Sequence, residues 1–287
     1  MIIDGHAHIF SSRIISAVTA KSAMVEKLKL QASFAEGRTT TSALEDDCRS
    51  AGIDACLLLP TASVENVRNV NTAFIQLAAG SDILLTAGTL HPFYGDNKEE
   101  LLRLREHGVR AIKLCSFSQG FALSTPETYR LFNIIESANS PTTGGTFVIL
   151  DTFSLAHDYF GTPDRHTTTP LLLGDIVRKY PGIDFVAAHM GGLAAPPEET
   201  FKHLVPSKNL YLDTSNAAHT LSERDFLRLL EIHGPDHIIF GTDWPWFDHP
   251  KELTLIARLL DLAGYNRDEK EKVFYRNSAA LLGIVQS

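Results

Sequence analysis

The chain has 287 residues, of which 44% are hydrophobic and 21% are charged. These values are ordinary for a globular protein and exclude the disordered and fibrous classes. The 26 basic and 34 acidic residues give a formal net charge of −8. This acidic balance argues against nucleic acid or an anionic membrane as a partner, because both need a basic field. The net charge does not argue against a small-molecule substrate, because such a substrate makes only local contacts.

The N-terminus and the cysteines bear on where the protein works. Residues 1–6 contain no basic stretch that leads into an apolar run, so we expect no secretory signal. No stretch approaches the roughly 18 apolar residues of a membrane span. Cys48, Cys56 and Cys115 are widely spaced, which is typical of a reducing compartment, and we expect them to be buried and unbridged. We therefore expect a cytoplasmic protein, and the sequence leaves open whether it forms a homodimer.

Short apolar runs recur along the chain, and each is bounded by turn residues and followed by a helical pattern. The runs at 147–150 and 185–188 lack polar alternation, as expected of strands that are covered on both faces. The expected strands are residues 2–4, 55–59, 83–89, 110–114, 147–150, 184–188, 210–213 and 237–240.

The helices between these strands have recognisable start signals. Thr169, which a proline follows, precedes apolar residues at i, i+3, i+4 and i+7 and predicts a helix start. Ser222 precedes the same spacing, with Asp225 three residues on as a weak capping box. Strands alternating with helices over this length predict an α/β fold, a (β/α)8 TIM barrel in a single domain spanning residues 1–287. A doubly wound sheet is the competitor, but no Gly-x-Gly-x-x-Gly turn follows any strand.

Residues that can bind a metal or move protons stand at the ends of these apolar runs. In a barrel they all project from the carboxyl-terminal rim of the strands, where barrel enzymes build their sites. We therefore expect the active site at that rim. The residues are His6, His8, Lys113, Asp151, His189 and Asp243.

Three of these positions have a functional and a plain structural interpretation. His6 and His8 are two apart in an extended segment, so both imidazoles can reach one cation, although they could also be solvated or packed. Asp243 is either a turn or capping carboxylate or one that takes a proton from metal-bound water. His189 is either a core histidine or a site residue, and the glycines after Met190 indicate a tight turn or a close approach.

Five segments resemble motifs of the amidohydrolase superfamily. They are closest to its second branch, which includes aminocarboxymuconate semialdehyde decarboxylase, and they occur in order between residues 4 and 245. The segments are Asp4-Gly-His-Ala-His8, Arg110-Ala-Ile-Lys-Leu114, Ala188-His-Met-Gly-Gly192, Leu210-Tyr-Leu-Asp-Thr214 and Phe240-Gly-Thr-Asp-Trp-Pro245. The resemblance implies a distorted TIM barrel that holds one divalent cation, often zinc.

The resemblance also implies roles for individual residues. His6 and His8 match the two metal ligands of the first strand, and Asp243 matches an aspartate that is both ligand and proton acceptor. His189 matches a histidine that orients the substrate or polarises its reacting group. Lys113 lies near the carboxylated lysine of binuclear relatives, and here it is a candidate substrate-binding cation or part of a rim salt bridge.

Asp151 departs from the pattern, because relatives usually place a histidine after the fifth strand. As a metal ligand, its carboxylate would favour a harder cation such as manganese or iron over zinc. Without it three donors remain, the number found in many catalytic sites, and a third outcome is a barrel with little metal affinity. Cys115 stands where relatives often have a histidine, and it is either a soft ligand or a buried bystander.

Two long connections, residues 10–38 and 152–169, are candidate covers over the site, because compact folds prefer connections of about 4–6 residues. Ordinary solvated loops are the alternative. His157 and Arg165 in the second connection are candidates for binding a substrate. A third connection follows Asp243, and its Trp244, Trp246 and Phe247 are candidates for an apolar wall of the pocket.

The leading functional hypothesis is a hydrolase that uses a metal-activated water on a small cyclic or carboxylate-bearing substrate, such as a lactone, amide or ester. In it Asp243 accepts the proton of the water and His189 steadies the developing oxyanion. The first alternative is a lyase that decarboxylates an aromatic or enoic acid without oxidation at the same site. The second is a degenerate barrel that binds a ligand without turnover, an alternative that Asp151 and Cys115 support.

Overall fold

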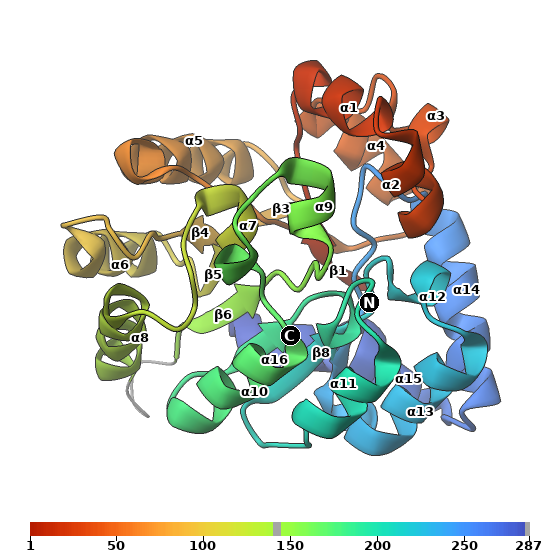
Figure 1. The fold of residues 1–287 in the computed structure, drawn as a ribbon. Coiled ribbons are helices and arrows are strands. Elements are labelled where there is room, and N and C mark those ends of the chain that lie inside the picture. The colour runs from red at the N-terminus through yellow and green to blue at the C-terminus, as the bar shows by residue number, and fades with distance from the viewer. Residues whose placement is uncertain (140–144, 285–287) are drawn as a thin grey trace.

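The computed structural model describes residues 1–139 and 145–284. Its strands are all parallel, and helices lie outside them (Figure 1). One sheet contains, in order, β1 (Ile3–Ala7), β2 (Ala55–Leu58) and β3 (Leu84–Thr86). A second contains β4 (Gly88–Thr89), β5 (Ala111–Leu114), β6 (Phe147–Leu150), β7 (Phe185–Ala187), β8 (Leu210–Asp213) and β9 (Ile238–Ile239). Strand order follows chain order throughout.

Backbone hydrogen bonds join the two sheets. Only Ala87 separates β3 from β4, and its N–H donates to the carbonyl of Leu58 at 2.8 Å, so residues 83–89 act as one interrupted strand. At the other edge the N–H of Gly5 donates to the carbonyl of Phe240 at 2.9 Å. β1 therefore lies beside the segment that follows β9. This is the arrangement of a TIM barrel, and it confirms the expected fold class.

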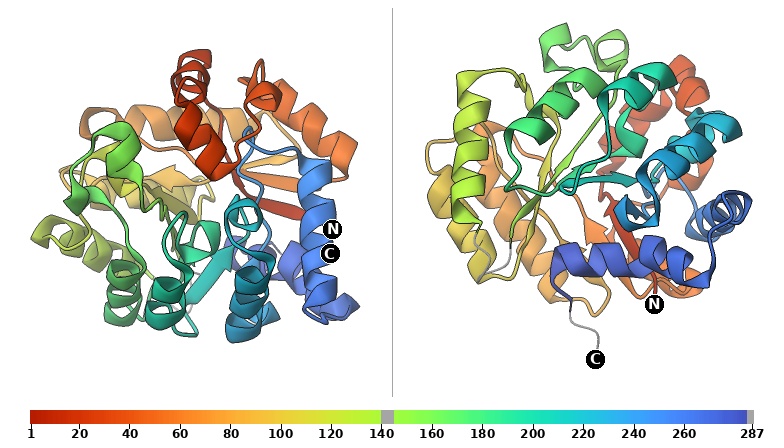
Figure 2. Two further views of the ribbon diagram at one scale, coloured as in Figure 1. Left: turned by 45° about the vertical axis from the view of Figure 1, so that its right-hand side comes forward. Right: turned by 90° about the horizontal axis from the view of Figure 1, so that it is seen from below.

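Helices surround the strands, as two further views show (Figure 2). Those that alternate with the strands are α4 (Thr41–Ala51), α5 (Val67–Ala79), α6 (Asn97–Glu106), α8 (Pro126–Ala138), α10 (Pro170–Lys179), α11 (Pro197–His203), α13 (Glu223–His233) and α14 (His249–Leu262). Further short helices in the connections after strand ends are α1 (Ser12–Thr19), α2 (Ser22–Leu28), α3 (Ala32–Ala35), α7 (Ser116–Gln119), α9 (Ala156–Phe160) and α12 (Ala217–Thr220). The chain ends in α15 (Arg267–Glu271) and α16 (Asn277–Leu282).

Two predicted helix starts are confirmed by their caps. The Thr169 hydroxyl accepts a hydrogen bond from the N–H of Leu172 at the start of α10. The Ser222 hydroxyl accepts one from the N–H of Asp225 at 3.1 Å at the start of α13. Each cap satisfies a backbone donor that the helix leaves free and contributes about 1 kcal/mol.

The strands are buried on both faces, as their unbroken apolar sequences predict. In β6, Phe147 and Ile149 belong to the cluster inside the ring, while Val148 and Leu150 pack outward in the cluster shared with the helices. Full burial of one such aliphatic side chain contributes about 1.5–3 kcal/mol. Apolar packing on both faces stabilises the ring of strands. It therefore fixes the position of the strand ends, from which the site residues project.

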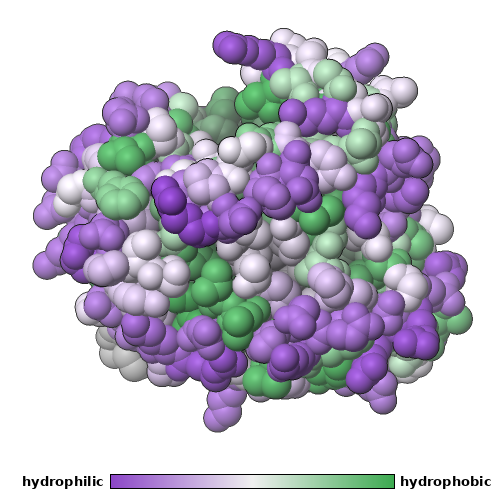
Figure 3. Space-filling model, in the orientation of Figure 1, coloured by the Kyte–Doolittle hydropathy of each residue, from purple (hydrophilic) through white to green (hydrophobic). Residues whose placement is uncertain are grey.

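A separate apolar cluster covers the carboxyl ends of the strands. Ile15, Met24 and Leu28 of the short helices α1 and α2 pack there with Phe153 and Trp246 from the connections after β6 and β9. Both long connections expected as covers therefore lie over this end of the ring. The rest of the face seen in Figure 3 is largely hydrophilic, with limited apolar areas.

None of the helices in the described part of the chain combines the length and apolar character that a membrane span requires.

Candidate functional site

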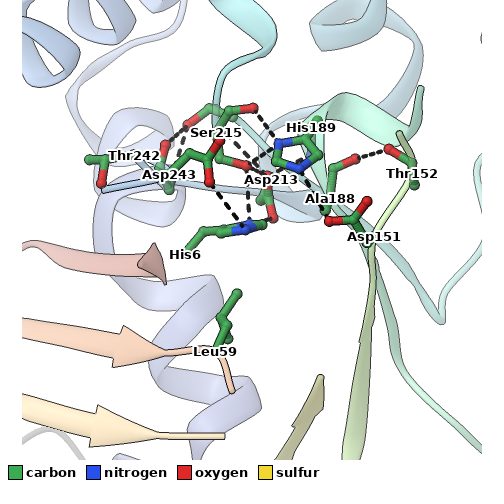
Figure 4. A network of polar contacts seen from close by, with 12 residues as sticks. His6, Leu59, Asp151, Thr152, Ala188, His189, Asp213, Ser215, Thr242 and Asp243 are labelled. Atoms are coloured by element: carbon green, nitrogen blue, oxygen red, sulfur yellow. Dashed lines mark hydrogen bonds and ion pairs between the residues drawn. The ribbon is translucent and has the colours of Figure 1, made fainter. Parts of the chain in front are cut away.

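Three predicted metal-binding residues converge at the carboxyl ends of the strands. His6 lies in β1, His8 directly follows it, and Asp243 lies three residues beyond Phe240 (Figure 4 labels His6 and Asp243). The Nε2 atoms of His6 and His8 are 3.1 Å apart. Asp243 Oδ1 is 3.9 Å from Nε2 of His6 and 3.6 Å from Nε2 of His8. Three possible ligand atoms, two from the start of the sequence and one from near its end, thus lie close enough together to bind one cation.

The protonation of the two imidazoles follows from their second nitrogens. Nδ1 of His8 faces the carbonyl of Leu59 at 3.0 Å, and Nδ1 of His6 faces Oδ2 of Asp213 at 2.8 Å. Both partners are acceptors, so each Nδ1 carries the hydrogen and each neutral ring has its lone pair on Nε2. Burial lowers the pKa of His6 to about 4 and that of His8 well below its usual value. The rings are therefore neutral, and two lone pairs face each other.

This donor set fits a divalent cation. Facing lone pairs repel unless a cation lies between them, and no proton is available for that position. In a tetrahedral zinc site with bonds of about 2.0–2.1 Å, neighbouring ligand atoms are about 3.3 Å apart. The separations of 3.1–3.9 Å between these donor atoms surround that value. His6, His8 and Asp243 are therefore suited to hold the cation.

Asp213 is a residue that sequence reasoning missed. One of its oxygens holds His6, and the other accepts the backbone N–H groups of His189 at 2.8 Å and Ser215 at 3.1 Å. Burial opposes its charge, but His6, His189 and Ser215 outweigh burial and hold its pKa below the usual range. Its place at the carboxyl end of β8, inside one of the quoted segments, is the signal that could have identified it.

Asp151 lies outside the group formed by His6, His8 and Asp243, so its role as a metal ligand stays a prediction. Its Oδ2 is 3.6 Å from Nζ of Lys113 and 3.7 Å from Nε2 of His189. Burial opposes ionisation of Asp151, but Lys113 and His189 outweigh burial and hold its pKa well below the usual range. In return, Asp151 and Asp243 overcome the effect of burial on His189 and raise its pKa to about 9. Asp151 therefore balances two cations.

The pKa of Asp243 is shifted in the opposite direction from that of Asp151. Burial is the largest influence on it and raises its pKa to about 7. Its φ of 65° is in the left-handed region, as are the φ angles of His189 at 56° and Asn216 at 55°. Such a conformation costs a residue other than glycine about 1–3 kcal/mol and persists only where the surroundings enforce it. All three residues line the same cavity.

The site opens into a cavity of about 280 Å³. Its polar part contains His8, Lys113, Asp151, His189, Asn216 and Asp243. Its apolar part includes Phe10, Val18, Leu28, Phe117, Phe153 and Trp246. The polar groups come from the strand ends and most of the apolar ones from the two covering connections.

Asn216 is a second residue that sequence reasoning missed. It is 1% exposed and lines the cavity, yet neither its side-chain oxygen nor its nitrogen has a hydrogen-bond partner among the described residues. Nζ of Lys113, also buried and in the cavity wall, has no hydrogen-bond partner there beyond its ion pair with Asp151. Because unpaired buried polar groups cost free energy, these atoms are suited to bind a ligand.

The structure does not bring three expected substrate-binding residues to the cavity. Trp244 is buried in the core, where its Nε1 donates to Oδ2 of Asp47 at 2.9 Å. Trp246, another candidate for the apolar wall, does line the cavity. His157 and Arg165 are exposed on the outer side of their connection and are absent from the cavity wall. Their polar heads stay in water, where ionic groups are most stable.

The sequence also matches a known family. The family model described as Amidohydrolase matches residues 3–284. The chain belongs to the amidohydrolase family. This confirms the resemblance, and because the family consists of enzymes, it places the chain among enzymes. No curated protein matches the chain by sequence comparison.

Solved structures with the same fold share little sequence with the chain. An uncharacterized TIM-barrel protein from Bordetella bronchiseptica has a TM-score of 0.70 at 18% identity, with 98% of each chain covered. A 5-carboxyvanillate decarboxylase from Sphingomonas paucimobilis has 0.66 at 15%, with 99% of each chain covered. A probable 2-pyrone-4,6-dicarboxylic acid hydrolase from Acinetobacter baumannii has 0.65 at 18%, with 99% of each chain covered. At these identities the likeness establishes the fold alone.

We predict that His6→Ala and His8→Ala each lose one bound cation per chain relative to the parent protein, because each removes one of three donors. Elemental analysis of the dialysed proteins measures this, and circular dichroism verifies that the fold is kept. His157→Ala, which changes an exposed imidazole outside the cavity, is the matched control and should retain the parent content. Parent metal content in both site variants would contradict the assignment.

Proposed function

We propose that this amidohydrolase-family enzyme is a metal-dependent hydrolase of a small molecule that carries a carboxylate or a cyclic ester or amide. The observation that carries the proposal is the pair of neutral imidazoles, His6 and His8, whose Nε2 atoms face each other at 3.1 Å beside Asp243. When bound there, a divalent cation supplies a Lewis acid that polarises the substrate and lowers the pKa of water.

We further propose zinc as the cation. The case for manganese or iron depended on a second carboxylate ligand, and Asp151 is engaged by Lys113 and His189 instead. Two imidazoles and one carboxylate remain, a donor set that catalytic zinc sites use with the fourth position left for substrate or water.

Asp243 and His189 divide the proton chemistry in this proposal. Oδ1 of Asp243 faces the two imidazoles, which leaves Oδ2 to accept the proton of the attacking water. Its pKa of about 7 in the buried site matches a base that works near neutral pH. His189, with a pKa of about 9, is cationic at neutral pH and stabilises negative charge that develops on the substrate.

Substrate recognition falls to the remaining polar groups of the cavity and to its apolar wall. Lys113 offers a buried ammonium for a substrate carboxylate, and Asn216 offers a donor and an acceptor for a neighbouring polar group. The aromatic side chains Phe117, Phe153 and Trp246 suit an apolar ring or short chain. A cavity of about 280 Å³ limits the substrate to a small molecule.

Decarboxylation is the second candidate, and one observation favours it. His189 is protonated at neutral pH and its Nε2 lies at the cavity beside Asp151, so it can deliver a proton to the carbon that loses carbon dioxide. The same Lys113 and Asn216 would bind the acid. The 5-carboxyvanillate decarboxylase and the pyrone hydrolase of the same fold make both reactions reasonable for this scaffold.

A substrate panel tests the proposal. We expect the zinc-loaded protein to hydrolyse at least one small lactone, ester or amide that bears a carboxylate, with no release of carbon dioxide. Asp243→Asn should keep the fold and lower kcat by about 100-fold or more, because it removes the base. Carbon dioxide release from aromatic acids would select the lyase, and full activity of Asp243→Asn would remove Asp243 from the mechanism.

The role of Asn216 is tested with two substitutions. Its φ of 55° suits glycine, so Asn216→Gly removes the amide without new backbone strain. We expect KM for the best substrate to rise about tenfold, the value of one lost hydrogen bond, with a smaller change in kcat. Asn216→Asp keeps one acceptor and loses the donor. Unchanged KM in both variants would show that the amide does not bind the substrate.

The pair formed by Asp151 and His189 predicts a specific pH dependence. The rate should fall as the pH rises through about 9, since His189 then loses its positive charge. Asp151 raises that pKa, so Asp151→Asn lowers it and should move the alkaline limb of the kcat/KM profile to lower pH. Asp158→Asn, at an exposed carboxylate of α9, is the control. An alkaline limb at the same pH in the parent protein and in Asp151→Asn would disprove the pairing.

A further inference from the structure

A second group of metal-binding side chains lies between the ring of strands and the outer helices. Cys48 comes from α4, Cys56 from β2 and His249 from the first position of α14. The two Sγ atoms and one ring nitrogen all lie within 4.8 Å of one another, and all three residues are 0% exposed. None of them lines the cavity of the candidate active site. The group is therefore separate from that site.

A carboxylate adds a fourth donor to this group. Oδ2 of Asp4 is 3.0 Å from Nε2 of His249 and 3.8 Å from Sγ of Cys56, and Sγ of Cys48 is 3.8 Å from the same Nε2. With zinc–sulfur bonds of about 2.3 Å and zinc–nitrogen bonds of about 2.0 Å, tetrahedral ligand atoms are about 3.5 Å apart. The separations in the group surround that value.

One of these contacts is an ordinary ion pair, because Oδ2 of Asp4 lies 3.0 Å from Nε2 of His249. The contacts of the two thiols are not explained in this way. A buried free cysteine usually behaves as a small hydrophobic side chain among apolar neighbours, but here two thiols from different elements face an imidazole and a carboxylate. The sulfur contacts of 3.8 Å are long for hydrogen bonds, and Nδ1 of His249 has no partner among the described residues. Soft thiolates beside an imidazole are the donors that select zinc and similar cations.

We propose that Cys48, Cys56 and His249, with Asp4 as the fourth donor, form a second and structural site for a thiophilic divalent cation such as zinc. On binding, the two thiols and the Nε2–H of His249, which faces Asp4 at 3.0 Å, release their protons to solvent. Nε2 then gives its lone pair, and no electron is transferred. Four protein donors close the coordination sphere, so this site has no open position for a substrate.

The site would also position the catalytic donors. Oδ1 of Asp4 accepts the backbone N–H groups of His6 and Thr242, both at 3.0 Å, and its Oδ2 accepts the Thr242 hydroxyl at 2.6 Å. One carboxylate therefore connects the thiol group to β1 and to the segment that carries Asp243. A cation that fixes Asp4 would hold these two segments in register and join them to α4 and α14.

Cobalt(II) substitution tests this proposal on the intact chain. Thiolate ligands give cobalt(II) an intense charge-transfer absorption in the near ultraviolet, whereas the imidazole and carboxylate donors of the candidate active site give none. We expect the protein produced with cobalt in place of zinc to contain two cations per chain and to show this absorption. The His6→Ala, His8→Ala double variant should lose one cation and keep the absorption.

Cysteine variants complete the test. Cys48→Ser and Cys56→Ser should each lose most of the thiolate absorption, while Cys115→Ser, which changes the thiol in the cavity wall, should keep it. Circular dichroism verifies folding, and if a variant does not fold, the absorption of the parent protein alone decides. No thiolate absorption, a single cation per chain, or a disulfide between Cys48 and Cys56 in the isolated protein would each overturn the proposal.

Discussion

Two hydrogen-bond acceptors decide the geometry of the candidate active site. The carboxylate of Asp213 and the carbonyl of Leu59 each take the Nδ1–H of one imidazole and so direct both Nε2 lone pairs into the same space. Asp213 ends β8 and Leu59 directly follows β2, so the parallel ring of strands brings these acceptors to His6 and His8. His6 is fully buried, and His8 faces the cavity. The arrangement therefore suits a cation between the two rings.

The two carboxylates at the cavity illustrate how surroundings assign different roles to one functional group. Asp151 faces two cations, Lys113 and His189, and stays ionised. Asp243 faces two neutral imidazoles in a buried position, which raises its pKa to about 7. Carboxylates whose pKa values are pushed apart in this way serve different roles in an acid–base site. Asp151 in turn raises the pKa of His189 and so keeps it cationic.

The fold could be predicted because apolar runs and their spacing report burial directly. The run at 83–89 is one expected strand that the structure divides at Ala87, and the last strand is short, at Ile238–Ile239. Residues at the strand ends were placed well, since a barrel projects them to one rim. The connections expected to cover the site do lie over it, but His157, Arg165 and Trp244 within the connections do not reach the cavity. The direction of Trp244 or Arg165 depends on the local path of the loop, which no periodicity encodes.

Asp213 and Asn216 were not predicted for a different reason. The role of Asp213 depends on the hydrogen bonds that it accepts in the folded chain, and that of Asn216 on a side chain that the fold leaves without a partner among the described residues. The sequence encodes neither directly. Backbone strain shows how firmly the fold enforces such roles. Asp243, His189 and Asn216 all hold left-handed conformations at a cost of about 1–3 kcal/mol each. A Cβ on Gly241 would lie 2.8 Å from Cβ of His6, so the strand end that leads to Asp243 approaches the first metal-binding segment as closely as glycine permits. The burial of the surrounding strands offsets these costs, and relaxing any of them would let the donor atoms separate.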